Sequence, residues 1–209
     1  MSFYEELSKI DVDKFVSLVD SRTDADVERA IYKTTPRTVD DFAALISENA
    51  RKHYLDVMVQ EATQLTRKRF GRCVNMYLPL YLTNLCNNKC VYCGFSVMNK
   101  FKRVVLTMQE IEEELQAMNK MGYTNILLVS GENSHRAGMP YFREVLPLTK
   151  KYADYLQMEV QPLETEEYAE LKTLGLDAVS VYQETYHPGC YKQKQHLNLK
   201  SLTQHIPLS

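Results

Sequence analysis

The sequence has 209 residues, of which 44% are hydrophobic, and its 25 basic side chains are nearly balanced by 27 acidic ones. This composition suffices for one globular domain, and a formal net charge of -2 gives no reason to expect nucleic acid or a membrane as a partner. The amino terminus lacks the pattern of an export signal, and no apolar run approaches the roughly 18 residues of a membrane span. We therefore expect a cytoplasmic protein.

The first part of the chain, residues 1–72, is predicted to form a helical region. Thr38 followed by Asp41 is typical of a capping box and predicts a helix over residues 39–46. A longer helix is predicted over residues 48–70, where apolar side chains recur at helical spacing. The basic run in its last turn, Arg67-Lys68-Arg69, suits a helix dipole and is weak evidence for nucleic-acid binding.

From Cys73 onward the pattern changes to alternating strands and helices. Strands are predicted over residues 74–82, 125–129, 156–160 and 178–182. The helices between them are predicted from Thr107 to Gly122 and over residues 140–152 and 165–174. Repeated strand–helix units predict an α/β fold with a parallel sheet and right-handed crossovers.

Three cysteines, Cys86, Cys90 and Cys93, lie within eight residues directly after the first predicted strand. A loop this short can bring three sulfur atoms together, and clustered thiols in a chain without an export signal indicate a metal site and not a disulfide framework. Cys73 and Cys190 are most simply unpaired thiols.

The number of clustered thiols helps to distinguish a zinc ion from an iron–sulfur cluster. A structural zinc site normally has four protein ligands, and no second Cys or His pair follows at a suitable spacing. An iron–sulfur cluster held by three thiolates keeps one iron open for a ligand. This favours a cluster, while zinc and inert thiols remain as alternatives.

Polar side chains follow each of the predicted strands, at the edge where parallel sheets and barrels place their chemistry. Their positions indicate one shared site at the carboxyl ends of the strands. The candidates beyond the cysteines are Ser130, Gly131 and Glu132 at the end of the second strand, Glu159 at the end of the third, and Gln183, Glu184 and His187 at the end of the fourth.

The cysteine stretch resembles the signature of the radical S-adenosylmethionine (radical SAM) superfamily, C-x3-C-x-aromatic-C, with Tyr92 in the aromatic position. The segments 79–84, 93–96 and 181–187 are similar to the tyrosine lyases of that superfamily, and to 2-iminoacetate synthase above all. The resemblance implies a partial (β/α) barrel of the TIM type, with its first four strands over residues 73–187, behind an amino-terminal helical layer.

The resemblance also implies two cofactors, a 4Fe-4S cluster on the three cysteines and S-adenosylmethionine. The turn Ser130-Gly131-Glu132 resembles the family's Gly-Gly-Glu turn, which receives the methionine amine, although it could also be a plain strand-to-helix turn. The other implied cofactor contacts are Tyr92 near the adenine, and Glu159, Gln183 and Glu184, whereas His187 is implied to contact the substrate. The alternatives are loop packing for Tyr92, solvated helix starts for Glu159 and Gln183, and a turn for His187.

The implied reaction is cleavage of tyrosine to 2-iminoacetate and p-cresol, which supplies the thiazole part of thiamine. The implied partners are tyrosine, a thiazole synthase and an electron donor of the ferredoxin or flavodoxin type. The rival hypotheses are the tyrosine lyase of iron-only hydrogenase maturation, a radical enzyme that acts on tRNA, and a non-catalytic metal-binding remnant.

The tail, residues 188–209, does not resemble the family. It has no acidic residue from Lys192 onward and no recognisable fifth strand, whereas a full barrel takes about 250 residues. We therefore expect a carboxyl-terminally truncated enzyme with an exposed sheet edge, which would not turn over tyrosine by itself.

Overall fold

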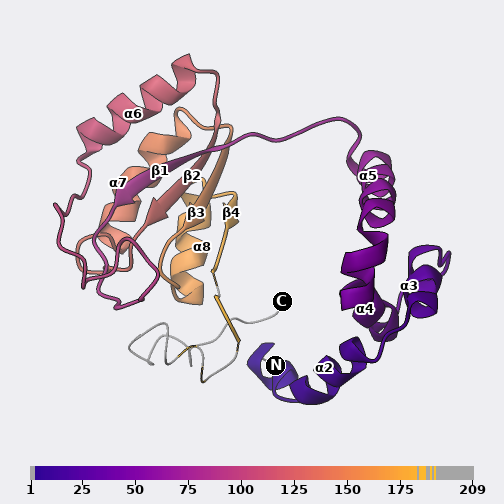
Figure 1. Ribbon diagram of the computed structural model, residues 1–209. Helices are drawn as coiled ribbons and strands as arrows, with labels where there is room; N and C mark the ends of the chain where they lie inside the picture. Colours follow the sequence, from indigo (N-terminus) through magenta and orange to yellow (C-terminus); the bar gives the residue numbers. More distant parts are fainter. Residues whose placement is uncertain (1–2, 183, 187–188, 190, 192–209) are drawn as a thin grey trace. The chain divides into compact units, whose positions relative to one another are not determined.

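The computed structural model describes residues 3–182, 184–186, 189 and 191. It divides into two compact units, with the boundary between Val74 and Asn75 (Figure 1). Among the helices of this described part, none is both long and apolar enough to cross a membrane.

Helices and the turns between them make up the described residues of the amino-terminal unit, as predicted. Thr23 and Thr38 each form a capping box with the aspartate three residues on, so these helices begin where their caps place them. The predicted long helix includes a π-helical turn, and it ends at Gly71, whose φ of 67° needs a glycine. The elements are α1 (Phe3–Leu7), α2 (Val12–Asp20), α3 (Asp24–Ile31), α4 (Val39–Leu45), η1 (Ala50–Tyr54) and α5 (Leu55–Phe70).

This unit has a small core of its own, made by Val27, Ala30 and Ile31 of α3 with Ala44 and Ala50. Beside the core, the buried Asp41 carboxylate accepts from Lys33 Nζ at 2.5 Å and from the backbone of Thr38 at 2.7 Å. The Lys33 ammonium and this backbone N–H hold the pKa of Asp41 well below its usual range. The carboxylate therefore stays charged while it caps α4.

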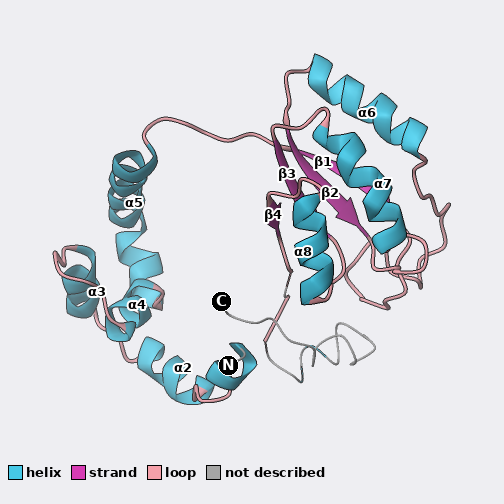
Figure 2. Cartoon of the chain, turned by 180° about the vertical axis from the view of Figure 1, so that it is seen from behind, coloured by secondary structure: helices cyan, strands magenta, loops and turns pink. Residues whose placement is uncertain are grey.

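The second unit is a four-stranded parallel sheet in the order β1-β2-β3-β4. A helix separates each strand from the next, and Figures 1 and 2 show these helices on one side of the sheet. The α/β class and the parallel strand order are confirmed. The elements are β1 (Leu78–Thr83), α6 (Met108–Lys120), β2 (Asn125–Ser130), α7 (Met139–Lys150), β3 (Tyr155–Glu159), α8 (Thr165–Thr173) and β4 (Ala178–Val179).

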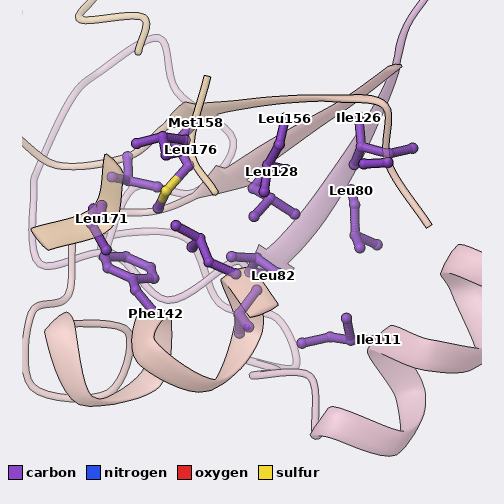
Figure 3. Close-up of a cluster of buried hydrophobic side chains, with 14 of the residues drawn as sticks. Leu80, Leu82, Ile111, Ile126, Leu128, Phe142, Leu156, Met158, Leu171 and Leu176 are labelled. Carbon is purple, nitrogen blue, oxygen red and sulfur yellow. The ribbon is translucent and has the colours of Figure 1, made fainter. Parts of the chain in front are cut away.

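The core of this unit lies between the sheet and its helices (Figure 3). Every second strand residue contributes to it, because successive side chains of a strand point to opposite faces. The strands supply Leu80, Leu82, Ile126, Leu128, Leu156 and Met158, and the helices supply Ile111, Leu115, Phe142, Val145, Leu146 and Leu171, all of them buried.

The other face of the sheet is less covered. Tyr81 of β1 is 53% exposed, while its neighbours in the pairing on this face, Val129 of β2 and Glu159 of β3, are half-buried. The pairing of Tyr81 with Val129, and of Val129 with Glu159, places one acidic side chain on this face at the carboxyl edge of the sheet.

Two predicted strands are shorter than expected. Residues 74–77 precede β1 unpaired, because β2 begins only at Asn125 and its first residues pair from Leu78 onward. At the other edge, pairing of β4 is limited to Ala178–Val179 within the described residues, followed by one bond from Ser180 N to Met158 O at 2.8 Å. The predictions of strands over 74–82 and 178–182 were therefore too long.

Asp177 lies between α8 and β4 and connects this segment to β3 by hydrogen bonds. Its Oδ2 accepts from the backbone N–H of Leu156 and from Lys150 Nζ, both at 2.8 Å, while its own N–H donates to Leu156 O at 2.9 Å. One side chain thus fixes the end of α7, the start of β3 and the entry to β4.

Replacing Asp177 with Ala should destabilise this unit by about 2 kcal/mol, because the Leu156 N–H and the Lys150 ammonium both lose their acceptor. Thermal unfolding followed by circular dichroism measures the loss. Asp154→Ala is the matched control, since the exposed Asp154 contributes a backbone carbonyl and not its carboxylate to Lys150.

The stability difference between Asp177→Ala and the parent chain should depend on pH. The Lys150 ammonium and the Leu156 N–H lower the pKa of Asp177. Its contribution is therefore complete above the unfolded-state pKa of about 4 and is lost as the pH falls through the lowered folded value. Asp177→Ala should differ from the parent chain most at neutral pH and least in acid; an equal difference at all pH values would contradict this assignment.

Candidate metal centre

The three clustered cysteines lie in the loop after β1, at the carboxyl edge of the sheet. Cys86, Cys90 and Cys93 are half-buried free thiols. Cys73 is an exposed thiol in the amino-terminal unit, and Cys190 falls outside the described residues. The structure therefore brings the loop cysteines to the end of the sheet where Ser130, Gly131, Glu132 and Glu159 lie, whereas Cys73 belongs to the other unit.

Arg103 closes this loop. Its guanidinium donates to four backbone carbonyls, those of Asn84 at 2.6 Å, Phe95 at 2.8 Å, Ser96 at 2.6 Å and Asn99 at 3.1 Å. The first carbonyl precedes Cys86 and the other three follow Cys93. One side chain thus fastens both ends of the cysteine loop to each other, and it also packs on the ring of Phe101, 4.0 Å from the ring centroid.

Two asparagines complete the closure. Asn84 accepts from Val104 N at 2.8 Å and donates to Lys102 O at 3.1 Å. Asn99 donates to the carbonyls of Cys93 at 3.2 Å and Gly94 at 3.0 Å. These two side chains therefore pair the backbone groups of Cys93, Gly94, Lys102 and Val104 within the chain itself.

The turn after β2 packs directly against the cysteine loop. Gly131 N donates to Thr83 O at 3.1 Å, and Asn87 N donates to Glu132 O at 3.0 Å. A side chain at Gly131 would collide, since its Cβ would lie 2.2 Å from Leu85 O and 3.1 Å from Cys86 Cβ. The close approach of two backbones explains this glycine before any cofactor is considered.

The Glu132 carboxylate, after β2, is held by a hydrogen bond from a residue beyond β4. Tyr182, three residues beyond β4, donates its hydroxyl to Glu132 Oε1 at 2.5 Å, a length typical of a charge-assisted bond. This is the one side-chain hydrogen bond of the Glu132 carboxylate within the described residues. The sequence reasoning missed Tyr182, although it belongs to the segment 181–187 that resembles the family.

The electrostatics show how close these groups are. Burial raises the pKa of Cys90, and the neighbouring Cys86, Cys93 and Glu132 raise it further. Burial, then Glu132, Cys90 and Glu184, raise the pKa of Tyr191 to about 12. Negative charge is therefore costly here without a cation, and a bound metal would supply that cation.

Two of the remaining predicted site residues, Ser130 and Glu159, lie on opposite faces of the sheet. The Ser130 hydroxyl is buried without a hydrogen-bond partner within the described residues, and Ser130 shares its face with Ile126 and Leu128, towards the helices. A contact from Ser130 to a cofactor would therefore involve its backbone. Glu159 lies on the opposite face, at the end of β3.

Tyr92 is 53% exposed on the cysteine loop, and Glu184 is exposed beyond β4. The predicted contacts of Gln183 and His187 lie outside the described residues and stay predictions. Arg103 was missed by the sequence reasoning, because a lone arginine ten residues after Cys93 has no pattern that marks it.

The donor set fits an iron–sulfur cluster, because three soft thiols of one short loop lie together at the carboxyl edge of the sheet. Within the described residues, no three His, Cys, Asp or Glu side chains are grouped as ligands of one metal ion. Asn88 N also donates to Cys86 Sγ at 3.5 Å, the kind of N–H···S contact that tunes iron–sulfur clusters.

Comparison with known proteins identifies relatives for this arrangement. The model of the radical SAM superfamily matches residues 80–200. The 2-iminoacetate synthase of Salmonella typhimurium is 47% identical over 92% of this chain, and that of Escherichia coli is 47% identical over 95% of it. These matches include the amino-terminal unit. The chain spans about half the length of these curated relatives, 50% and 52%.

Among solved structures, HydG, a maturase of the FeFe-hydrogenase, superposes with a TM-score of 0.71 over 93% of this chain and 42% of its own. Its sequence identity is 23%, so this match bears on the fold alone. It supports the barrel-type architecture that the sequence predicted.

Replacing Gly131 with Ala should disturb the cysteine loop. Its Cβ must displace the Leu85 carbonyl, which we expect to cost about 1–3 kcal/mol and to lower iron uptake on anaerobic reconstitution. Iron and sulfide content per chain, with the melting temperature, measures both effects.

Gly94→Ala is the matched control, because a Cβ at Gly94 meets no atom within 4 Å. It should load iron as the parent chain does. Equal iron uptake by the Gly131 and Gly94 variants would show that the close contact at Gly131 does not shape the metal centre.

Proposed function

Because the chain belongs to the radical SAM superfamily, whose cofactors are a 4Fe-4S cluster and S-adenosylmethionine, we propose that it is part of a tyrosine lyase that forms 2-iminoacetate. The product would supply the thiazole part of thiamine, and p-cresol would be the second product. The observation that carries this proposal is the identity of 47% to two 2-iminoacetate synthases, over both units of the chain.

We assign each of the candidate residues a role towards the cluster or S-adenosylmethionine. Cys86, Cys90 and Cys93 would hold the cluster, which when reduced would supply the electron that cleaves S-adenosylmethionine to methionine and a carbon radical. Glu132, whose carboxylate accepts from Tyr182 at Oε1, would accept a hydrogen bond from the methionine ammonium. The exposed ring of Tyr92 lies on the same loop as the cysteines and is the candidate surface for the adenine.

Glu159 is the candidate partner for ribose hydroxyls or for the substrate ammonium. It is the acidic residue that β3 places on the less covered face, at the carboxyl edge of the sheet. Gln183, Glu184 and His187 are proposed to follow it along the same edge, with His187 at the substrate tyrosine.

The hydrogenase-maturation lyase is the nearest rival, and it is less favoured. HydG shares the fold at 23% identity, half of that to the 2-iminoacetate synthases. A purely structural metal site is disfavoured by Glu132, because its carboxylate is poised beside the thiols with one oxygen free of protein partners among the described residues.

The proposed partners are tyrosine, a thiazole synthase that consumes the unstable imine, and a ferredoxin or flavodoxin that delivers electrons. We place the protein in the cytoplasm, since a reducing compartment keeps three adjacent thiols available for iron.

The proposal predicts a cluster on the loop thiols alone. Reconstituted anaerobically, the 209-residue chain should bind about four irons. Cys90→Ala should lose the brown cluster spectrum, and the matched variant Cys73→Ala should keep it, because Cys73 belongs to the other unit. Iron analysis and absorption near 400 nm measure this; a colourless zinc protein would contradict the proposal.

The activity is tested in a chimaera in which residues 1–182 replace the matching half of the Escherichia coli relative. It should release p-cresol from tyrosine when S-adenosylmethionine and a reductant are present, and the Cys90→Ala chimaera should not. The 209-residue chain alone is expected to form no p-cresol, because it spans about half of its relatives. A chimaera that cleaves S-adenosylmethionine without consuming tyrosine would reject the lyase and keep the superfamily.

A separate prediction concerns Glu132. In the reconstituted chain, Glu132→Gln should weaken S-adenosylmethionine binding about tenfold, since a charge-assisted bond to an ammonium is lost. Tyr182→Phe should weaken it about fivefold by releasing the carboxylate. Equilibrium dialysis measures the affinity, and the cluster spectrum should stay unchanged in both variants.

The controls are Glu144→Gln and Tyr155→Phe, exposed residues of α7 and β3. Both should bind as the parent chain does. In the Glu132→Gln background, Tyr182→Phe should have no further effect; additive losses would mean that Tyr182 acts independently of Glu132.

A further inference from the structure

The cysteine loop has an unusual charge for this chain. From Asn84 to Gln109 there are four basic residues, Lys89, Lys100, Lys102 and Arg103, and no acidic one, although acidic residues outnumber basic ones in the whole chain. The next acid, Glu110, lies beside Lys102 but is engaged by the Thr107 cap. The loop is thus a positive surface on a slightly negative protein.

The Arg103 charge adds to this surface. Within the described residues its guanidinium contacts carbonyl oxygens and the Phe101 ring, and no carboxylate. Hydrogen bonds to carbonyls satisfy the donors without cancelling the formal charge.

The same loop exposes large apolar side chains. Val91 is 64% exposed, Val97 47% and Met98 68%, and all three lie between residues that the Arg103 bonds hold together. A closed loop cannot bury these side chains by collapsing on itself. Protein–protein interfaces have an apolar centre and a polar rim. Exposed apolar side chains with basic side chains around them have this composition.

We propose that this loop surface, formed by Lys89, Val91, Val97, Met98, Lys100 and Lys102, docks an acidic flavoprotein of the flavodoxin type that reduces the cluster. The inference rests on the proposed function, because it requires the cluster on Cys86, Cys90 and Cys93. It names the surface through which that cluster receives its electron.

Charge and shape argue for this occupant. An acidic carrier is steered to the basic rim, and a small transient contact suffices for electron transfer. The apolar dimethylbenzene edge of a flavin fits exposed Met98 and Val91 side chains. The anionic flavin hydroquinone would give one electron to the cluster and become the neutral semiquinone, so no proton is released and no covalent bond changes in the protein.

A second basic stretch, Arg67-Lys68-Arg69, is exposed at the end of α5. It belongs to the other unit and not to the unit that holds the thiols. The loop surface is therefore the better site for electron delivery, and the α5 stretch serves as the competing site in the test.

The test is stopped-flow reduction of the reconstituted 209-residue chain by a flavodoxin hydroquinone. The rate should fall with ionic strength, and Lys100→Glu with Lys102→Glu should lower it at least about tenfold. The control is Lys120→Glu with Lys151→Glu, exposed lysines at the carboxyl ends of α6 and α7, at the opposite end of the sheet. Dithionite should reduce all variants equally. A loop variant that flavodoxin reduces at the parental rate, or an equal loss in the control, would overturn the proposal.

Cross-linking gives a readout that needs no cluster. A carbodiimide should join carboxylates of oxidised flavodoxin to Lys89, Lys100 or Lys102 of the apo chain, as read by peptide mass spectrometry. Cross-links concentrated at Lys68 would overturn the proposal, and a response to an acidic ferredoxin but not to flavodoxin would overturn the choice of flavoprotein. A chain that binds no iron yet cross-links through the loop lysines would reject the proposed function and support the docking surface.

Discussion

The closure of the cysteine loop by Arg103 is the interaction on which the metal centre depends. A loop of some twenty residues that presents three thiols must leave many backbone groups outside regular structure, and buried carbonyls without donors are costly. A single guanidinium has five donors in a fixed plane, and here it satisfies carbonyls on both sides of the cysteines. A lysine has no comparable fork, so the loop requires arginine at this position. The backbone at both ends of the cysteine loop is therefore held by the chain itself.

The sheet contributes the second constraint, because parallel strands end at one edge and deliver their loops to the same place. Gly131 lets the turn after β2 touch the loop after β1, and Tyr182 reaches Glu132 from beyond β4. These contacts join residues about fifty positions apart in the chain. The centre is thus assembled by strand order, and its precision comes from a few side chains that lock neighbouring loops together.

The features that the sequence predicted correctly depend on residues that are close together in the chain. The capping boxes at Thr38 and Thr107 and the alternating core residues of the strands depend on neighbours three or two positions away, and they are where the pattern placed them. The roles of Arg103 and Tyr182, and the true ends of β1 and β4, depend on partners far along the chain. No local pattern specifies such partners. That three thiols share one loop at the carboxyl edge of the sheet was predictable because they lie within eight residues directly after a strand.

The electrostatics of the second unit complete the account. Near the carboxyl edge of the sheet, burial and the neighbouring Cys86, Cys93 and Glu132 raise the pKa of Cys90, and burial with Glu132, Cys90 and Glu184 raises that of Tyr191. Such a place disfavours added negative charge and favours a cationic ligand. Lys89, Lys100 and Lys102 carry the opposite charge on the exposed loop. One loop therefore combines a site that attracts a cationic cofactor with a surface that attracts an anionic protein, so that the two need not compete for the same groups.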